Sequence, residues 1–218
     1  MDILEEFEAF KKEKKTPTSK NTKKAVAVLI FISLIMFAKL APYGGSPIIE
    51  DTLAKQIFSL YFFIVNQTLG IVHESGHGIC YILHLPPFIT ALNGTIFQLL
   101  FPLGIGYYYK RQGQVFAYLI GLFFFGISLH YTAWYISTAH EGLHLPASKS
   151  FLGVDALHDF NYILTQLHLL SYNALIAGFI RFIAYMFMFY ASGKMILLAF
   201  FARVENSKKK VGYRRTKK

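Results

Sequence analysis

Apolar residues in this chain form long runs, separated by short polar, Gly or Pro breaks. Most of these runs contain few charges and reach the roughly 20 residues that a helix needs to cross a bilayer. A shorter apolar segment, His158 to Leu170, follows a polar loop over 139–158. The long runs predict helices over Ala25 to about Pro42, about Thr52 to Leu85, Ile89 to Tyr109, Val115 to about Thr138, and Ala174 to Ala202.

This pattern predicts an all-α fold, a polytopic membrane helix bundle with four to six apolar spans. Basic clusters outside the first and last spans place both termini in the cytoplasm, which requires an even number of crossings. With four crossings, parts of 86–109 or 158–172 would be re-entrant, and such segments must be buried in protein. Lys110 and Arg111 favour four crossings, whereas the lengths of the apolar segments favour six.

Composition and charge divide the chain into three regions. Residues 1–24 form a basic leader with a short amphipathic segment, 25–203 a membrane-embedded helical domain, and 204–218 a basic tail. The chain is 54% hydrophobic with a mean hydropathy of +0.41, more apolar than an ordinary soluble domain. Fifteen of its 22 Lys and Arg residues lie in 1–24 and 203–218, so the charge of +10 is concentrated at the ends. We therefore expect the ends to contact anionic lipid at a cytoplasmic membrane face, and we expect no nucleic-acid partner.

The second apolar run contains the motif His-Glu-x-x-His at His73, Glu74 and His77. Positions i and i+4 share one face of a helix, so both imidazoles can reach one metal ion. Glu74, between them, can activate a water molecule. Ionisable groups within an apolar span are costly and usually functional, so this motif predicts an intramembrane zinc site.

A second copy of the motif occurs at His140, Glu141 and His144. Gly142 and Pro146 leave little helix there to hold two imidazoles on one face. We therefore assign the metal to His73 and His77, and interpret the second copy as an interfacial loop.

A catalytic zinc site has a third protein ligand and one open position. Acidic residues are rare between Thr52 and Ala202, and two candidates stand together near the start of the last short apolar segment. These are Asp159 and His158. Asp159 could instead act as a carboxylate of the first helical turn, which favours the helix dipole.

Three polar or small residues within apolar segments are candidates for contact with a substrate. Asn66 lies seven residues before His73, on the same helix face. Gly94 and Gln98 lie one turn apart in the third apolar run, with Pro102 one turn further. A buried Gln amide can bind an extended substrate backbone, or it can satisfy the backbone of a kinked helix.

Together these motifs resemble small bacterial membrane proteins that are distantly similar to the site-2 protease family of intramembrane zinc metalloproteases. The matching residues are His73, Glu74 and His77; Gly94, Gln98 and Pro102; and His158, Asp159 and Phe160. The resemblance implies a bacterial cytoplasmic-membrane protein in which two histidines and a later aspartate hold Zn²⁺ and the glutamate activates water. Site-2 proteases usually place that aspartate in an Asp-Gly pair, which this chain lacks, so Asp159 and His158 both remain candidates.

The resemblance implies hydrolysis of peptide bonds in the membrane-embedded segments of other proteins. The alternative is a non-proteolytic membrane subunit with a metal-stabilised core that binds partner transmembrane helices. The short loops and abundant aromatic residues fit either function.

Overall fold

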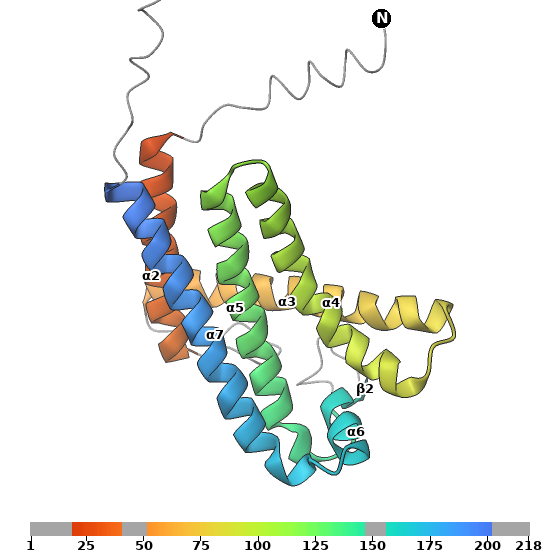
Figure 1. Cartoon of the computed structure of the whole chain (residues 1–218). Coiled ribbons are helices and arrows are strands. Elements are labelled where there is room, and N and C mark those ends of the chain that lie inside the picture. Colours follow the sequence, from red (N-terminus) through yellow and green to blue (C-terminus); the bar gives the residue numbers. More distant parts are fainter. Residues whose placement is uncertain (1–18, 41–51, 147–155, 202–218) are drawn as a thin grey trace, which may run out of the picture.

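The structure, a computed structural model, describes residues 19–40, 52–146 and 156–201 and is all-α, as the sequence predicts (Figure 1). The predicted amphipathic segment of the leader and the basic tail lie outside the described residues. The longer helices are α2 (Lys20–Leu40), α3 (Leu53–Ile82), α4 (Pro87–Arg111), α5 (Val115–Ser137), α6 (Asp159–Gln166) and α7 (Asn173–Ile196). The short elements are η1 (Ala139–Glu141), β1 (His144–Leu145), β2 (Ala156–Leu157), η2 (Leu170–Tyr172) and η3 (Leu197–Phe201).

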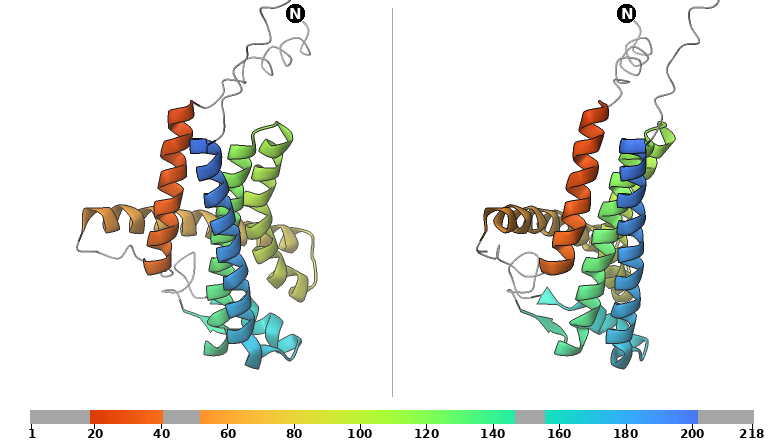
Figure 2. Two further views of the ribbon diagram at one scale, coloured as in Figure 1. Left: turned by 60° about the vertical axis from the view of Figure 1, so that its left-hand side comes forward. Right: turned by 90° about the vertical axis from the view of Figure 1, so that its left-hand side faces the viewer.

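Within the described part of the chain, four helical segments are long and apolar enough to cross a membrane. They are Lys20–Ala38, Pro87–Arg111, Val115–Glu141 and Leu170–Phe201. The corresponding helices α2, α4, α5 and α7 run lengthwise through the bundle, whereas α3 lies across them (Figure 1). The start of α2, the α4–α5 turn and the end of α7 lie at the same end of the bundle (Figure 2). This arrangement supports four crossings, but with a different set of helices from the one expected. Residues 86–109, a candidate for a re-entrant segment, form a lengthwise helix, whereas the long apolar run over 52–85 forms the crosswise helix α3.

Polar caps and prolines set the helix ends close to their predicted positions. Helix α2 starts five residues before the predicted Ala25, because the Ser19 hydroxyl accepts a hydrogen bond from the Thr22 amide at 3.1 Å. Thr52 caps α3 in the same way, accepting from the Lys55 amide at 3.5 Å. Pro87 occupies the first turn of α4, where its missing N–H costs nothing.

Pro102 lies inside α4 and leaves one carbonyl of the helix without its usual partner. Proline has no amide hydrogen to donate to the carbonyl four residues earlier, which is that of Gln98. The Ser128 hydroxyl of α5 donates to this carbonyl oxygen at 3.1 Å. A neighbouring helix thus replaces the lost hydrogen bond, as an apolar environment requires. This contact fixes α5 against the part of α4 that carries Gln98.

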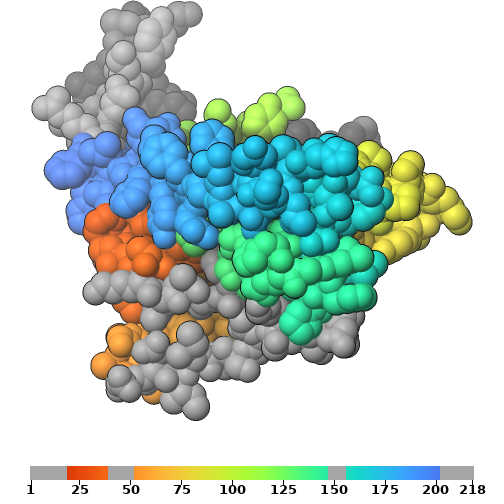
Figure 3. All heavy atoms as spheres, turned by 90° about the horizontal axis from the view of Figure 1, so that it is seen from below, coloured from red at the N-terminus to blue at the C-terminus, as the bar shows by residue number. Residues whose placement is uncertain are grey.

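Most of the core lies between α2, α5 and α7, where Phe37, Phe123 and Met188 are fully buried. Glycines let the helix backbones approach closely. A Cβ at Gly121 of α5 would lie 2.7 Å from the Cα of Gly106 in α4. A second cluster joins α6 to the end of α5. In the view from below, α7 extends from beside α2 toward the yellow region where α3 ends and α4 begins (Figure 3).

Candidate metal centre

His73 and His77 lie on the face of α3 that packs against α4. Buried residues recur along α3 at spacings of one, three or four residues, and both histidines belong to this stripe. His73 is 2% exposed and His77 is 9% exposed. The two helices can approach closely because Gly76 has no side chain. A Cβ at this position would lie 2.6 Å from the Asn93 carbonyl oxygen. The Asn93 side chain donates to the Gly76 carbonyl at 2.8 Å, which fixes the crossing.

The start of α6 brings Asp159 to the same point, 86 residues from His73 in sequence. The Nε2 atoms of His73 and His77 lie 3.0 Å apart. Oδ2 of Asp159 lies 3.0 Å from Nε2 of His73 and 3.2 Å from Nε2 of His77. These three residues form the one group of His, Cys, Asp and Glu side chains, within the described ranges, whose ligand atoms converge closely enough for a metal ion. We call this group the metal triad.

Both imidazoles use their other nitrogen for a hydrogen bond to an oxygen atom. Nδ1 of His73 lies 3.1 Å from Oε1 of Gln98, and Nδ1 of His77 lies 2.8 Å from the carbonyl oxygen of Thr90. A carbonyl oxygen only accepts, so Nδ1 of His77 is the donor; the Gln98 amide is oriented to accept in the same way. Each neutral imidazole then presents the lone pair of Nε2 to the triad, as a metal ligand does.

The spacing and chemistry of the triad fit a zinc ion. Corners of a tetrahedron around zinc are about 3.3 Å apart when the ligands lie 2.0–2.1 Å from the metal. The three separations in the triad are 3.0, 3.0 and 3.2 Å. Two imidazole nitrogens and one carboxylate oxygen form a donor set found in catalytic zinc sites, with a fourth position left for water or substrate.

Tyr135 of α5 holds the carboxylate of Asp159. Its hydroxyl accepts from the backbone amide of Asp159 at 3.2 Å and donates to Oδ2 of the same residue at 3.3 Å. Burial disfavours the charged carboxylate, but in the metal-free protein a proton on Nε2 of His73 or His77 is shared with it, which outweighs burial and lowers the pKa of Asp159. The carboxylate is therefore ionised and held in one orientation.

Gly94 of α4 lies directly against the triad. A Cβ at this position would lie 2.5 Å from Nε2 of His77 and 2.8 Å from Nε2 of His73. No side chain larger than hydrogen fits there without displacing an imidazole. Gly94, which the sequence analysis treats as a candidate for substrate contact, therefore lies beside the ligand atoms.

His158, the other candidate for third ligand, faces away from the triad. Its Nδ1 accepts from the Asn161 amide at 3.4 Å and so caps α6, and its Nε2 lies 3.1 Å from the Thr138 hydroxyl. Its ring stacks on Tyr135, with centroids 4.3 Å apart and an interplanar angle of 10°. Of the two alternatives, the geometry brings Asp159 to the histidines and gives His158 a supporting position behind Tyr135.

The remaining candidates lie near the triad without belonging to it. Glu74 is half-buried, close enough for its charge to act on His77, and makes no hydrogen bond or ion pair within the described residues. The side-chain nitrogen of Gln98 is buried and has no hydrogen-bond partner among the residues described. Asn66 is buried on the same face of α3, about two turns before His73.

The second His-Glu-x-x-His copy does not form a helical pair. Residues 139–141 form the short 3-10 helix η1, and Gly142 adopts a φ of +128°, which breaks the helix. His144 then enters β1, which pairs antiparallel with β2. Nδ1 of His140 lies 2.8 Å from the Ser137 carbonyl oxygen and 3.2 Å from the side-chain nitrogen of Asn173.

Sequence reasoning missed Tyr135 and Thr90. Tyr135 lies in an apolar run rich in aromatic residues, where nothing in the sequence distinguishes it from packing neighbours such as Tyr131. Thr90 contributes its backbone carbonyl, a group that every residue has, so its identity carries no signal.

No protein-family model matches the chain, and neither a curated protein nor a solved structure shows significant similarity to it.

Proposed function

We propose that the chain is an intramembrane zinc metalloprotease that hydrolyses peptide bonds in membrane-embedded segments of other proteins. The observation that supports this most strongly is the triad itself. Two Nε2 atoms and one carboxylate oxygen face each other within 3.2 Å, while both Nδ1 atoms have oxygen partners. Three lone pairs that face one another repel unless a cation or protons lie between them.

In this proposal His73, His77 and Asp159 hold the zinc ion. The chemistry supplied by bound zinc is Lewis-acid polarisation of water and of a peptide carbonyl. Gln98 and Thr90 keep the two imidazoles in the tautomer that can bind metal, and Tyr135 orients Asp159. The small size of Gly94 keeps the space beside the two Nε2 atoms open.

Glu74 is the proposed general base and acid. Its carboxylate has no competing hydrogen bond within the described chain, lies one residue from His73, and is half-buried. It takes a proton from the attacking water and returns it to the leaving amine of the cleaved peptide bond. The water oxygen forms the new bond to the carbonyl carbon as the C–N bond breaks.

Gln98 is the proposed contact for the substrate backbone. Its Oε1 is used by His73, and its buried Nε2 lacks a partner among the described residues. A buried N–H without an acceptor costs about 1–3 kcal/mol, so an acceptor that enters the site would relieve this cost. A peptide carbonyl from an extended substrate is such an acceptor. Asn66, about two turns before His73 in α3, is a proposed second contact.

We also propose that the shared end of α2, α4 and α7 faces the cytoplasm, so that both termini are cytoplasmic. Basic residues cluster at this end, including Lys20, Lys23, Lys110, Arg111 and Lys194, and cytoplasmic loops are enriched in Lys and Arg. The resemblance suggests a bacterial cytoplasmic membrane. A reporter that is active only after export, fused after Lys218, should be inactive; an active fusion would reject this topology.

The test uses the purified full-length protein in nanodiscs with a panel of transmembrane-segment peptides. We expect about one zinc per chain in the wild type, in Glu74→Gln, and in the control Glu141→Gln from the second motif copy. Cleavage, followed by mass spectrometry, should persist in the control and fall by about 10²–10⁴-fold in Glu74→Gln.

Other outcomes separate the alternatives. Normal cleavage by Glu74→Gln would reject the mechanism. Zinc in all three proteins, with no cleavage of any peptide, would favour the non-proteolytic subunit that binds partner helices. Equal metal in wild type and His73→Ala would reject the metal site.

A further inference from the structure

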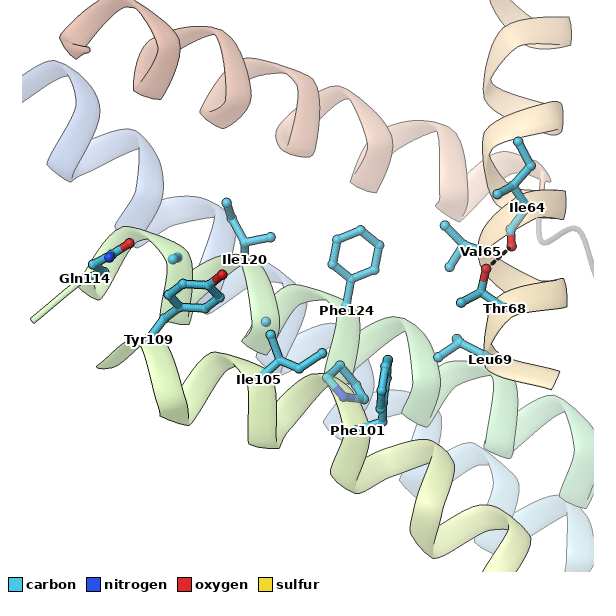
Figure 4. Close-up of a pocket in the computed structure, with 13 residues that line it drawn as sticks. Ile64, Val65, Thr68, Leu69, Phe101, Ile105, Tyr109, Gln114, Ile120 and Phe124 are labelled. Carbon is cyan, nitrogen blue, oxygen red and sulfur yellow. Dashed lines mark hydrogen bonds between the residues drawn. The ribbon is translucent and has the colours of Figure 1, made fainter. Parts of the chain in front are cut away.

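An apolar groove of about 530 Å³ lies between α3, α4 and α5, on the side of α3 toward the α4–α5 turn (Figure 4). Leu69 and Phe101 lie at its inner end, where it meets the crosswise helix α3. Tyr109 and Gln114 lie at its outer end. Along α4, residues 101 to 109 span about 12 Å at 1.5 Å per residue.

The polar atoms of this groove are concentrated at its outer end. Thr68 lines the inner part, but its hydroxyl is already donated to the Ile64 carbonyl at 2.9 Å. The Tyr109 hydroxyl and the Gln114 amide are the other polar side-chain groups among the described lining residues. The groove therefore suits a ligand with a long apolar part and a polar group at one end.

Positive charge lies beside that outer end. Lys110 and Arg111 directly follow Tyr109 and are exposed. The Lys110 ammonium lies 4.8 Å from the centre of the ring of Tyr118 in α5, and Ala117, the chain neighbour of Tyr118, lines the groove.

This charge has no acidic partner within the part of the chain that the structure describes. The only acidic residues there are Glu74, Glu141 and Asp159, on α3, in η1 and on α6. None of them lies at the α4–α5 turn. An anionic group is therefore the complement that this end of the groove lacks.

We infer that the groove is a binding site for an anionic phospholipid, with acyl chains along α4 and α5 and the headgroup phosphate at Lys110 and Arg111. A transmembrane protein helix would bring its own Lys and Arg against Lys110 and Arg111 at the proposed cytoplasmic end, where such residues are enriched. This inference does not depend on the metal site.

The test measures lipid retained by the full-length protein in nanodiscs of phosphatidylcholine with a minor fraction of phosphatidylglycerol, by native mass spectrometry. Lys110→Gln and Arg111→Gln should each weaken phosphatidylglycerol binding roughly fivefold, the effect of one basic residue near an anionic surface. The matched control is Lys194→Gln, because Lys194 also lies over a tyrosine ring, at 5.9 Å from that of Tyr190, but belongs to α7, which contributes no residue to the groove. It should retain the lipid.

A second variant, Ala117→Phe, fills the groove and leaves the charges in place. It should lose the lipid while keeping the zinc content and melting temperature of the wild type. If it fails to fold, the two exposed charge variants still decide the question. Equal retention in wild type, Lys110→Gln and Arg111→Gln would overturn the inference. Cross-links from position 117 to a polypeptide in place of lipid would also overturn it, in favour of a protein helix.

Discussion

The hydroxyl of Tyr135 bridges the backbone amide and the side-chain carboxylate of one residue, Asp159. It accepts from the amide at 3.2 Å and donates to Oδ2 at 3.3 Å, so its single proton is committed to the carboxylate. The ring behind the hydroxyl stacks on His158, which caps the helix that Asp159 begins. Tyr135 therefore fixes both the position of the helix start and the direction of its carboxylate.

Removing this hydroxyl should weaken metal binding without loosening the packing. Tyr135→Phe keeps the ring stacked on His158 but leaves the Asp159 carboxylate free to rotate. Loss of a group that orients a ligand typically costs 10–100-fold in metal affinity. Zinc affinity, measured by competition with a chelator, should fall by that factor while the melting temperature of the metal-free protein changes little.

Tyr185→Phe is the control, because Tyr185 packs edge-on against His130 in another part of the bundle. It should bind zinc as tightly as the wild type. Equal affinities in Tyr135→Phe and Tyr185→Phe would show that the Asp159 carboxylate needs no support from Tyr135.

A methyl group at position 94 should abolish the metal site. In Gly94→Ala the new Cβ would lie within 3 Å of Nε2 in both His73 and His77, and backbone on α4 cannot easily retreat. Zinc content should fall from about one per chain to near zero, as measured by elemental analysis.

Gly104→Ala on the same helix is the matched control, because a Cβ there meets nothing within 4 Å. It should keep its zinc and gain up to about 1 kcal/mol in stability, the difference in helix propensity between Gly and Ala. Full zinc binding by Gly94→Ala would mean that the ligand atoms do not lie where the structure places them.

Local patterns predicted most of the fold. Apolar runs, Pro87 and the Gly142–Pro146 break fixed the helices and their ends, because these features act within a few residues. The orientation of α3 across the bundle was not predicted, because it depends on packing partners distant in sequence, such as Asn93 against Gly76. The sequence could therefore not decide between four and six crossings.

In the candidate site, too, the sequence predicts features that depend on local spacing but not contacts between distant segments. The i, i+4 spacing predicts that His73 and His77 share a face, and the structure places them so. The sequence could not decide between Asp159 and His158, because the side chains of neighbouring residues at a helix start point in different directions. Gln98 was nominated for a substrate, and its contact with His73 could not be predicted from spacing across two helices.

The identity of the third ligand can be tested by two substitutions at adjacent positions. Asp159→Ala removes a ligand atom and should release the metal, as should His77→Ala. His158→Asn should retain it, because Asn is a good N-cap and His158 acts as the cap of α6. Elemental analysis of each purified variant provides the measurement.

His140→Ala and His144→Ala complete this series. Both residues belong to the second motif copy, where η1 and Gly142 separate their side chains. Their zinc content should equal that of the wild type. Loss of zinc in His144→Ala with retention in His77→Ala would reverse the assignment of the two copies.

Metal binding should weaken on acidification through the histidines and not through Asp159. In the metal-free protein, protons on Nε2 of His73 and His77 are shared with Asp159 and lower its pKa, so this carboxylate stays ionised below its ordinary value of about 3.9. Its contribution to stability is present above that value and is lost only as the pH falls through the lowered pKa. Between pH 8 and 5 its charge is therefore constant.

Zinc binding requires both imidazoles to be neutral, so protons compete with the metal for Nε2 of His73 and His77. Chelator competition between pH 5 and 8 should therefore give a zinc affinity that falls as the pH is lowered. The limiting slope is about 100-fold per pH unit, because two protons replace one zinc. A slope that begins only near pH 4 would mean that a carboxylate, and not the histidine pair, controls the site.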